Sequence, residues 1–145
     1  MNYFLDTNVI IDAIQNKKPS LRDYFKKIYA SDIFVSTIVI AELEFGAAHS
    51  KNYLKNKSLY EQFIKDFAVV PFVKEYCTLY GEIRQQLTKI GQPIGLNDLL
   101  IATTAMANGS ILVTHNTDEF KRIPNLLLED WTVPPLPRVP PQLLP

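Results

Sequence analysis

The stretch GLNDLLIATTAMANGSILVTHNTDEF, residues 95–120, contains an acidic residue, an apolar helix-like segment, a short apolar run and a polar cluster, in that order. Asn97 can cap a helix over residues 97–108, and Asn108-Gly109 can end it with a left-handed residue. The run ILVT at 111–114 then predicts a strand. A helix that leads into a buried strand is typical of α/β proteins, so this unit indicates the fold class.

The rest of the chain repeats the same alternation of short apolar runs and longer helix-like segments. Strands are predicted at 3–5, 33–36, 68–70, 111–114 and 126–130, and helices at 8–15, 20–30, 38–49, 52–66, 73–90 and 97–108. Strands separated by helices form parallel sheets. We therefore predict an α/β fold with a central parallel sheet of four to five strands.

Length and composition indicate one globular domain followed by a short tail. The chain has 145 residues, of which 47% are hydrophobic and 21% charged, and this composition argues against disorder. Six of the last twelve residues are prolines, which cannot donate backbone hydrogen bonds. We predict a domain over residues 1–133 and an extended Pro-rich tail over 134–145.

The net charge does not indicate a binding partner, whereas the cysteine content indicates the redox state of the compartment. Fifteen basic and fifteen acidic residues give zero net charge, so bulk charge does not indicate nucleic-acid binding. The single cysteine, Cys77, cannot form an internal disulfide, fits a reducing cytoplasm and is expected to pack as a small apolar residue. The opening MNYFLDTNVIIDAI lacks the features of a signal peptide or a membrane span.

Three acidic residues lie in apolar surroundings at separate strand ends or helix starts: Asp6, Glu42 and Asp98. A charge in such a place is costly unless it is paired or binds a metal ion. Carboxylates gathered in one cleft repel one another, so a divalent cation is their natural partner. Taken singly, Asp6 and Asp98 could equally be helix caps, and Glu42 could be an exposed helical residue.

A second polar group follows the strand at 111–114. It consists of His115, Asn116, Thr117, Asp118 and Glu119. Asn116 has the best position to reach the same edge of the sheet, whereas Asp118 and Glu119 could instead cap the next segment. Two histidines and one cysteine are too few for a zinc site, and the chain lacks GxxxxGK[ST], GxGxxG and GxSxG motifs.

Three segments together resemble the PIN-domain ribonucleases of the VapC toxin type. They are LDTNVII at 5–11, STIVIAELEFGA at 36–47 and GQPIGLNDLLIATTAMANGSILVTHNTDEFKRIPNLLLEDW at 91–131. The likeness extends over residues 2–131 and is most specific from Gly91 to Trp131. It implies a PIN-like three-layer α/β/α fold, and a PIN domain over residues 1–133.

The resemblance also implies the chemistry of the site. The family's acidic site falls on Asp6, Glu42 and Asp98 as metal ligands, and its fourth position falls on Asn116, where many relatives have Asp. Asp118 or Glu119 could supply the missing charge, and Thr7 and Ser36 match small residues that line such sites. The implied activity is Mg²⁺- or Mn²⁺-dependent cleavage of RNA. The alternative is a non-catalytic PIN-like module that binds RNA or protein, although such a module would not need the three acids.

Finally, the resemblance implies partners. A cognate VapB-like antitoxin would fill the acidic cleft, often with a basic residue, and the toxin would be a homodimer, with helices 38–49 and 73–90 as possible interfaces. The substrate would be structured RNA, with a tRNA anticodon loop as the family-level expectation. Lys51, Lys55 and Lys57 form a basic stretch that could follow the phosphate backbone, or could simply be a solvated helix face.

Overall fold

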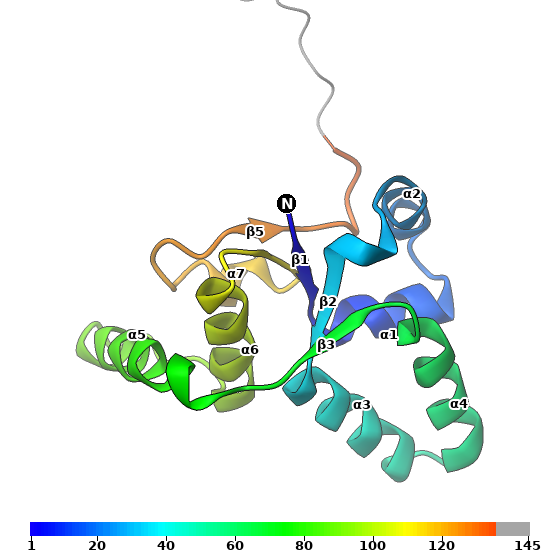
Figure 1. The fold of residues 1–145 in the computed structure, drawn as a ribbon, viewed down its shortest axis with the longest axis horizontal. Helices are drawn as coiled ribbons and strands as arrows, with labels where there is room; N and C mark the ends of the chain where they lie inside the picture. Colours follow the sequence, from blue (N-terminus) through cyan, green and yellow to red (C-terminus); the bar gives the residue numbers. More distant parts are fainter. Residues whose placement is uncertain (136–145) are drawn as a thin grey trace, which may run out of the picture.

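A computed structural model describes residues 1–135 of the chain. From residue 136 onward the predicted Pro-rich tail (134–145) lies outside the described residues. The described part forms a central sheet with helices on both sides (Figure 1).

The sheet has five strands, all parallel: β1 (Tyr3–Leu5), β2 (Ile33–Ser36), β3 (Ala68–Val70), β4 (Ile111–Val113) and β5 (Leu128–Glu129). Their order is β3-β2-β1-β4-β5, which puts the first strand in the middle. Leu5 is in register with Val113, so β1 and β4 end side by side. The predicted parallel sheet is confirmed, although β5 is shorter than the predicted 126–130.

The helices form the two outer layers. They are α1 (Thr7–Gln15), α2 (Pro19–Lys27), α3 (Thr37–His49), α4 (Tyr53–Ile64), α5 (Cys77–Lys89), α6 (Leu96–Ala107) and the short α7 (Thr117–Phe120). Figure 1 shows α1 and α4 on one side of the sheet and α5 and α6 on the other, with α3 running below the strand ends. α3 contacts α1, α4 and α6. This arrangement confirms the predicted three-layer α/β/α fold.

Several predicted helix boundaries were wrong. The segment 20–30 ends its helix at Lys27, and a 3₁₀ turn follows at Ala30–Asp32. The segment 73–90 divides into a 3₁₀ turn (Lys74–Tyr76) and α5. Asn97 does not cap α6: the helix begins one residue earlier, after Gly95, whose N–H donates to Glu119 Oε1 at 3.1 Å. That partner lies 24 positions along the chain, beyond the reach of a local pattern.

The core consists of apolar side chains from both faces of the sheet, and it fixes the strand ends. Leu5 and Val113 are fully buried, as are Ile101 and Ala102 of α6. Cys77 is not part of this core; it is exposed at the start of α5, which buries Ile83 and Leu87 instead, so the expected packing of Cys77 is wrong. Among residues 1–135, no helix is long and apolar enough to span a membrane.

Candidate active site

Asp6 follows β1 directly and is 4% exposed at the centre of the sheet edge. It is the N-cap of α1, and its Oδ1 accepts a hydrogen bond from the Thr7 N–H at 2.8 Å. Its Oδ2 accepts from the Thr114 hydroxyl at 2.8 Å. Burial raises the pKa of Asp6, while the Thr114 and Thr7 hydrogen bonds oppose that shift. Asp6 is thus both a helix cap and a buried carboxyl at the strand end.

Glu42 reaches the same edge from α3. Its Oε1 accepts a hydrogen bond from the Thr7 hydroxyl at 2.7 Å, which ties α3 to the start of α1. The negative charge of Glu42 also raises the pKa of Asp6, because like charges disfavour ionisation. Thr7 therefore connects Asp6 and Glu42, through its backbone to one and its hydroxyl to the other.

Asp98 lies in the first turn of α6 and is half-buried. Its pKa is raised to about 6, first by burial and then by the charges of Asp6, Glu119 and Glu42. The three predicted acids therefore lie at one edge of the sheet: Asp6 after β1, Glu42 in the second turn of α3 and Asp98 in the first turn of α6.

Glu119, on α7, is the fourth acid near Asp98. Its Oε1 accepts from the Gly95 N–H at 3.1 Å and its Oε2 accepts from the Asn116 amide at 2.8 Å. These two hydrogen bonds lower the pKa of Glu119. Arg122 donates to the Pro93 carbonyl at 3.0 Å, so Glu119 and Arg122 together hold the loop 91–95 that leads into α6.

The remaining predicted residues have different surroundings. Asn116 follows β4 as expected, but its amide is engaged by Glu119. Asp118 has a side chain 93% exposed and pairs with Lys121 at 3.1 Å, away from the carboxylates. Ser36 is buried and uses its hydroxyl to cap α3, accepting from Ile38 N at 3.1 Å and Val39 N at 3.3 Å.

Sequence reasoning missed two features of this edge. Thr114 is fully buried and holds Asp6 through its hydroxyl, while that same oxygen accepts from the Asn116 N–H at 3.0 Å. Asp12 of α1 pairs with His115, with 3.2 Å between Oδ2 and Nδ1. The only signal for Thr114 was a hydroxyl residue at the end of a buried strand.

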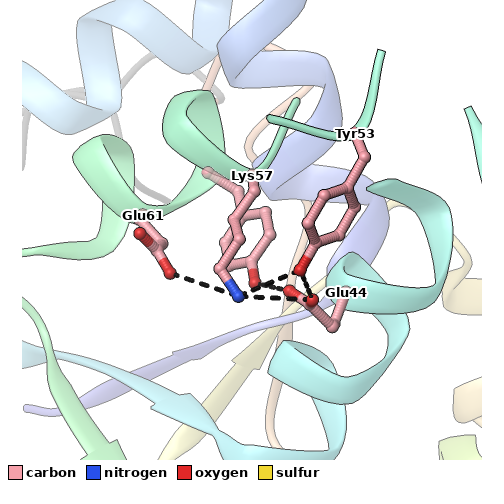
Figure 2. A network of polar contacts seen from close by, with 5 residues as sticks. Glu44, Tyr53, Lys57 and Glu61 are labelled. Carbon is pink, nitrogen blue, oxygen red and sulfur yellow. Dashed lines mark hydrogen bonds and ion pairs between the residues drawn. The ribbon is translucent and has the colours of Figure 1, made fainter. Parts of the chain in front are cut away.

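The basic stretch is split by the fold. Lys57 of α4 joins a polar network with Glu44 of α3 and Glu61, at 3.3 Å and 3.8 Å between Nζ and Oε1 (Figure 2). Tyr53 and Tyr60 both donate to the Glu44 carboxylate, which lowers its pKa. Lys51 and Lys55 are exposed, and within residues 1–135 neither forms an ion pair. Lys57 therefore serves to connect α3 with α4, while the other two face solvent.

The donor chemistry of the edge fits a divalent cation, although the side chains do not converge on one point. Within the described part of the chain, no three acidic, histidine or cysteine side chains form a metal-binding group. Asp6, Glu42 and Glu119 are each held by hydroxyl, amide or backbone donors, which keeps like charges apart. Carboxylate oxygens nevertheless suit hard cations, and a cation would offset the repulsion that raises the pKa of Asp98.

Together, the parallel sheet and the acidic edge define an α/β protein with a group of carboxylates at the strand ends. The PIN domain family model matches residues 3–126, so the chain belongs to the PIN-domain family.

Relatives that align over nearly their whole length carry VapC names. Ribonuclease VapC2 of Rickettsia felis is 42% identical over 135 residues, covering 90% of this chain and 98% of the relative. The tRNA(fMet)-specific endonuclease VapC of Shigella flexneri is 35% identical, covering 91% and 99%. Among solved structures, VapBC2 from Rickettsia felis bound to a promoter DNA fragment has a TM-score of 0.84 at 40% identity, covering 90% of this chain and 99% of that one. The resemblance read from the sequence is confirmed.

Proposed function

We propose that this protein is an endoribonuclease toxin of the VapC type that depends on Mg²⁺ or Mn²⁺. The observation that carries the proposal is the set of acids at one edge of the sheet, where burial and then the charges of Asp6, Glu119 and Glu42 raise the pKa of Asp98 to about 6. The names of the full-length relatives support an RNA-cleaving hydrolase.

Asp6, Glu42 and Asp98 would hold the cation, which would activate water and neutralise charge at the scissile phosphate. Thr114 and the Thr7 N–H keep Asp6 fixed, and the Thr7 hydroxyl fixes Glu42. Glu119 and Asn116 secure the loop before Asp98. The role of these residues is to hold the carboxylates in fixed positions at the sheet edge, from which a bound cation would draw them together.

Cleavage of RNA by the purified protein tests this proposal. We expect cleavage with Mg²⁺ or Mn²⁺ and none in excess chelator, and we expect Glu42→Gln to be inactive while keeping a cooperative thermal melt. Full activity in chelator contradicts the metal requirement. A wild type that binds RNA but never cuts it favours the alternative, a non-catalytic RNA-binding module.

We further propose that a VapB-like antitoxin binds beside the acids. A groove of about 280 Å³ lies between α1, α3 and α4 and has Glu42 in its wall; its apolar lining includes Ile11, Ile14, Leu43, Ala47 and Leu59. An apolar segment followed by a basic residue would match that lining and the acidic edge. The VapBC complexes among the structural relatives support such a partner.

The substrate is proposed to be structured RNA, and the place of action the cytoplasm. The name of the Shigella flexneri relative supports tRNA as the first substrate to try. Mapping the ends of cellular RNA after brief expression of the chain identifies the target. Uniform RNA decay, without a discrete new end, would contradict a specific toxin.

A further inference from the structure

The contact between Asp12 and His115, at the rim of the acidic edge, has no role in the chemistry proposed so far. Asp12 of α1 and His115, just after β4, approach to 3.2 Å between Oδ2 and Nδ1. Their side chains are 19% and 37% exposed, so the pair is neither buried in the core nor fully in solvent. Two elements of the site, α1 and the end of β4, therefore meet at this pair.

The pair fixes which nitrogen of His115 is free. An ionised carboxylate can only accept hydrogen bonds, so the imidazole must donate through Nδ1. Nε2 is then the nitrogen left for another partner, and when it also donates, both ring nitrogens carry a hydrogen and the imidazole is a cation. Asp12 thus orients the ring as a carboxylate orients a metal-binding or catalytic histidine, but here no metal group is formed among residues 1–135.

The backbone of His115 is held on both sides by residues of the site. Thr114, before it, bonds Asp6, and Asn116, after it, bonds Glu119. His115 therefore lies at the border of the acidic edge, where its imidazole becomes a cation when the second nitrogen donates to a phosphate.

We propose that His115, oriented by Asp12, binds a phosphate oxygen of the RNA next to the scissile bond. A pocket of carboxylates repels a polyanion, and a cationic donor at its rim offsets that repulsion where the strand enters. This inference rests on the proposed function and adds to it a substrate-positioning pair that lies outside the acids.

Binding and turnover, measured separately, test the pair. Binding uses a 2′-O-methyl RNA oligonucleotide followed by fluorescence anisotropy, and turnover uses the cleavable RNA. His115→Gln should raise both Kd and KM about five- to tenfold, as expected for one lost charged contact, with kcat within about twofold. Asp12→Asn should raise them less, and His115→Arg should recover most of the affinity because it restores a cationic donor.

His49, the other histidine, gives a matched control. It stacks on Phe45 at the end of α3, with 5.8 Å between ring centroids, and His49→Gln should change neither constant. An unchanged Kd in His115→Gln overturns the proposal, and so does a fall in kcat with unchanged KM or a loss of divalent-metal affinity. If the wild type never cuts RNA yet His115→Gln weakens binding, the proposed nuclease function fails while the phosphate contact stands.

Discussion

Asp98 is the residue at which the electrostatics of the pocket can be measured directly. Its pKa of about 6 in the folded chain lies above the ordinary value of 3.8, so the folded state holds its proton more tightly than the unfolded state does. The resulting stability is fully present below about pH 4 and is lost as the pH rises through about 6. Without a cation, the ionised pocket therefore destabilises the fold at neutral pH.

Asp98→Asn tests this reasoning on stability and activity together. In chelator at pH 7.5 the variant should melt about 3 °C above wild type, because it removes one like charge, and the gain should shrink at pH 4.5. With Mg²⁺ the cleavage rate of this variant should fall by more than roughly 10- to 100-fold. A loss of that size is typical when a residue that only hydrogen-bonds to a metal ligand is removed. A gain in melting temperature that is the same at both pH values would contradict the raised pKa.

Glu119 gives a second prediction at the residue scale. Glu119→Ala frees the Gly95 N–H and the Asn116 amide, so the loop before Asp98 should loosen and cleavage should drop about 10- to 100-fold with metal affinity little changed. Asp118→Asn is the matched control, since this neighbouring acid faces solvent. If Glu119→Gln abolishes metal binding as completely as Asp98→Asn does, Glu119 is itself a ligand.

At the scale of elements, the start of α4 and the turn before it carry lysines of two kinds. Lys51→Ala with Lys55→Ala should weaken RNA binding and lower the salt slope by about 1.4 to 1.8, because these two exposed lysines are free to contact phosphates. Lys57→Ala should change the slope less and lower the melting temperature instead, because Lys57 connects Glu44 with Glu61 (Figure 2). Equal salt slopes for the double variant and wild type would assign Lys51 and Lys55 to a solvated face.

The elements themselves could be predicted because their signals are local. The five strands are short apolar runs, and Asn108-Gly109 ends α6 with Gly109 at a φ of 60°. The start of α6 and the role of Thr114 could not be predicted, because each depends on a hydrogen bond to a residue far along the chain. Gly95, before α6, bonds Glu119, and Thr114 bonds Asp6. The three acids could be predicted because apolar neighbours isolate them, but their hydroxyl and amide partners could not.

At the scale of the whole molecule, the expected homodimer is testable by mass. Phe45 is 71% exposed on α3, one of the two helices predicted to form an interface. Light scattering should give twice the 16.5 kDa of one chain, and Phe45→Ser should shift the protein toward the monomer. Leu54→Ser, at 76% exposure on α4, is the control; an equal shift in both variants would remove α3 from the interface.

The central position of β1 has a consequence for the chain during its synthesis. β1 is made first but gains its second neighbour, β4, only when residues 111–113 exist, and the bond from Thr114 to Asp6 spans 108 positions. A nascent chain that already carries Asp6, Glu42 and Asp98 thus lacks the strand that completes their pocket. Such distant pairings form late in folding. The chain should therefore be unable to cleave RNA until nearly the whole domain has emerged from the ribosome.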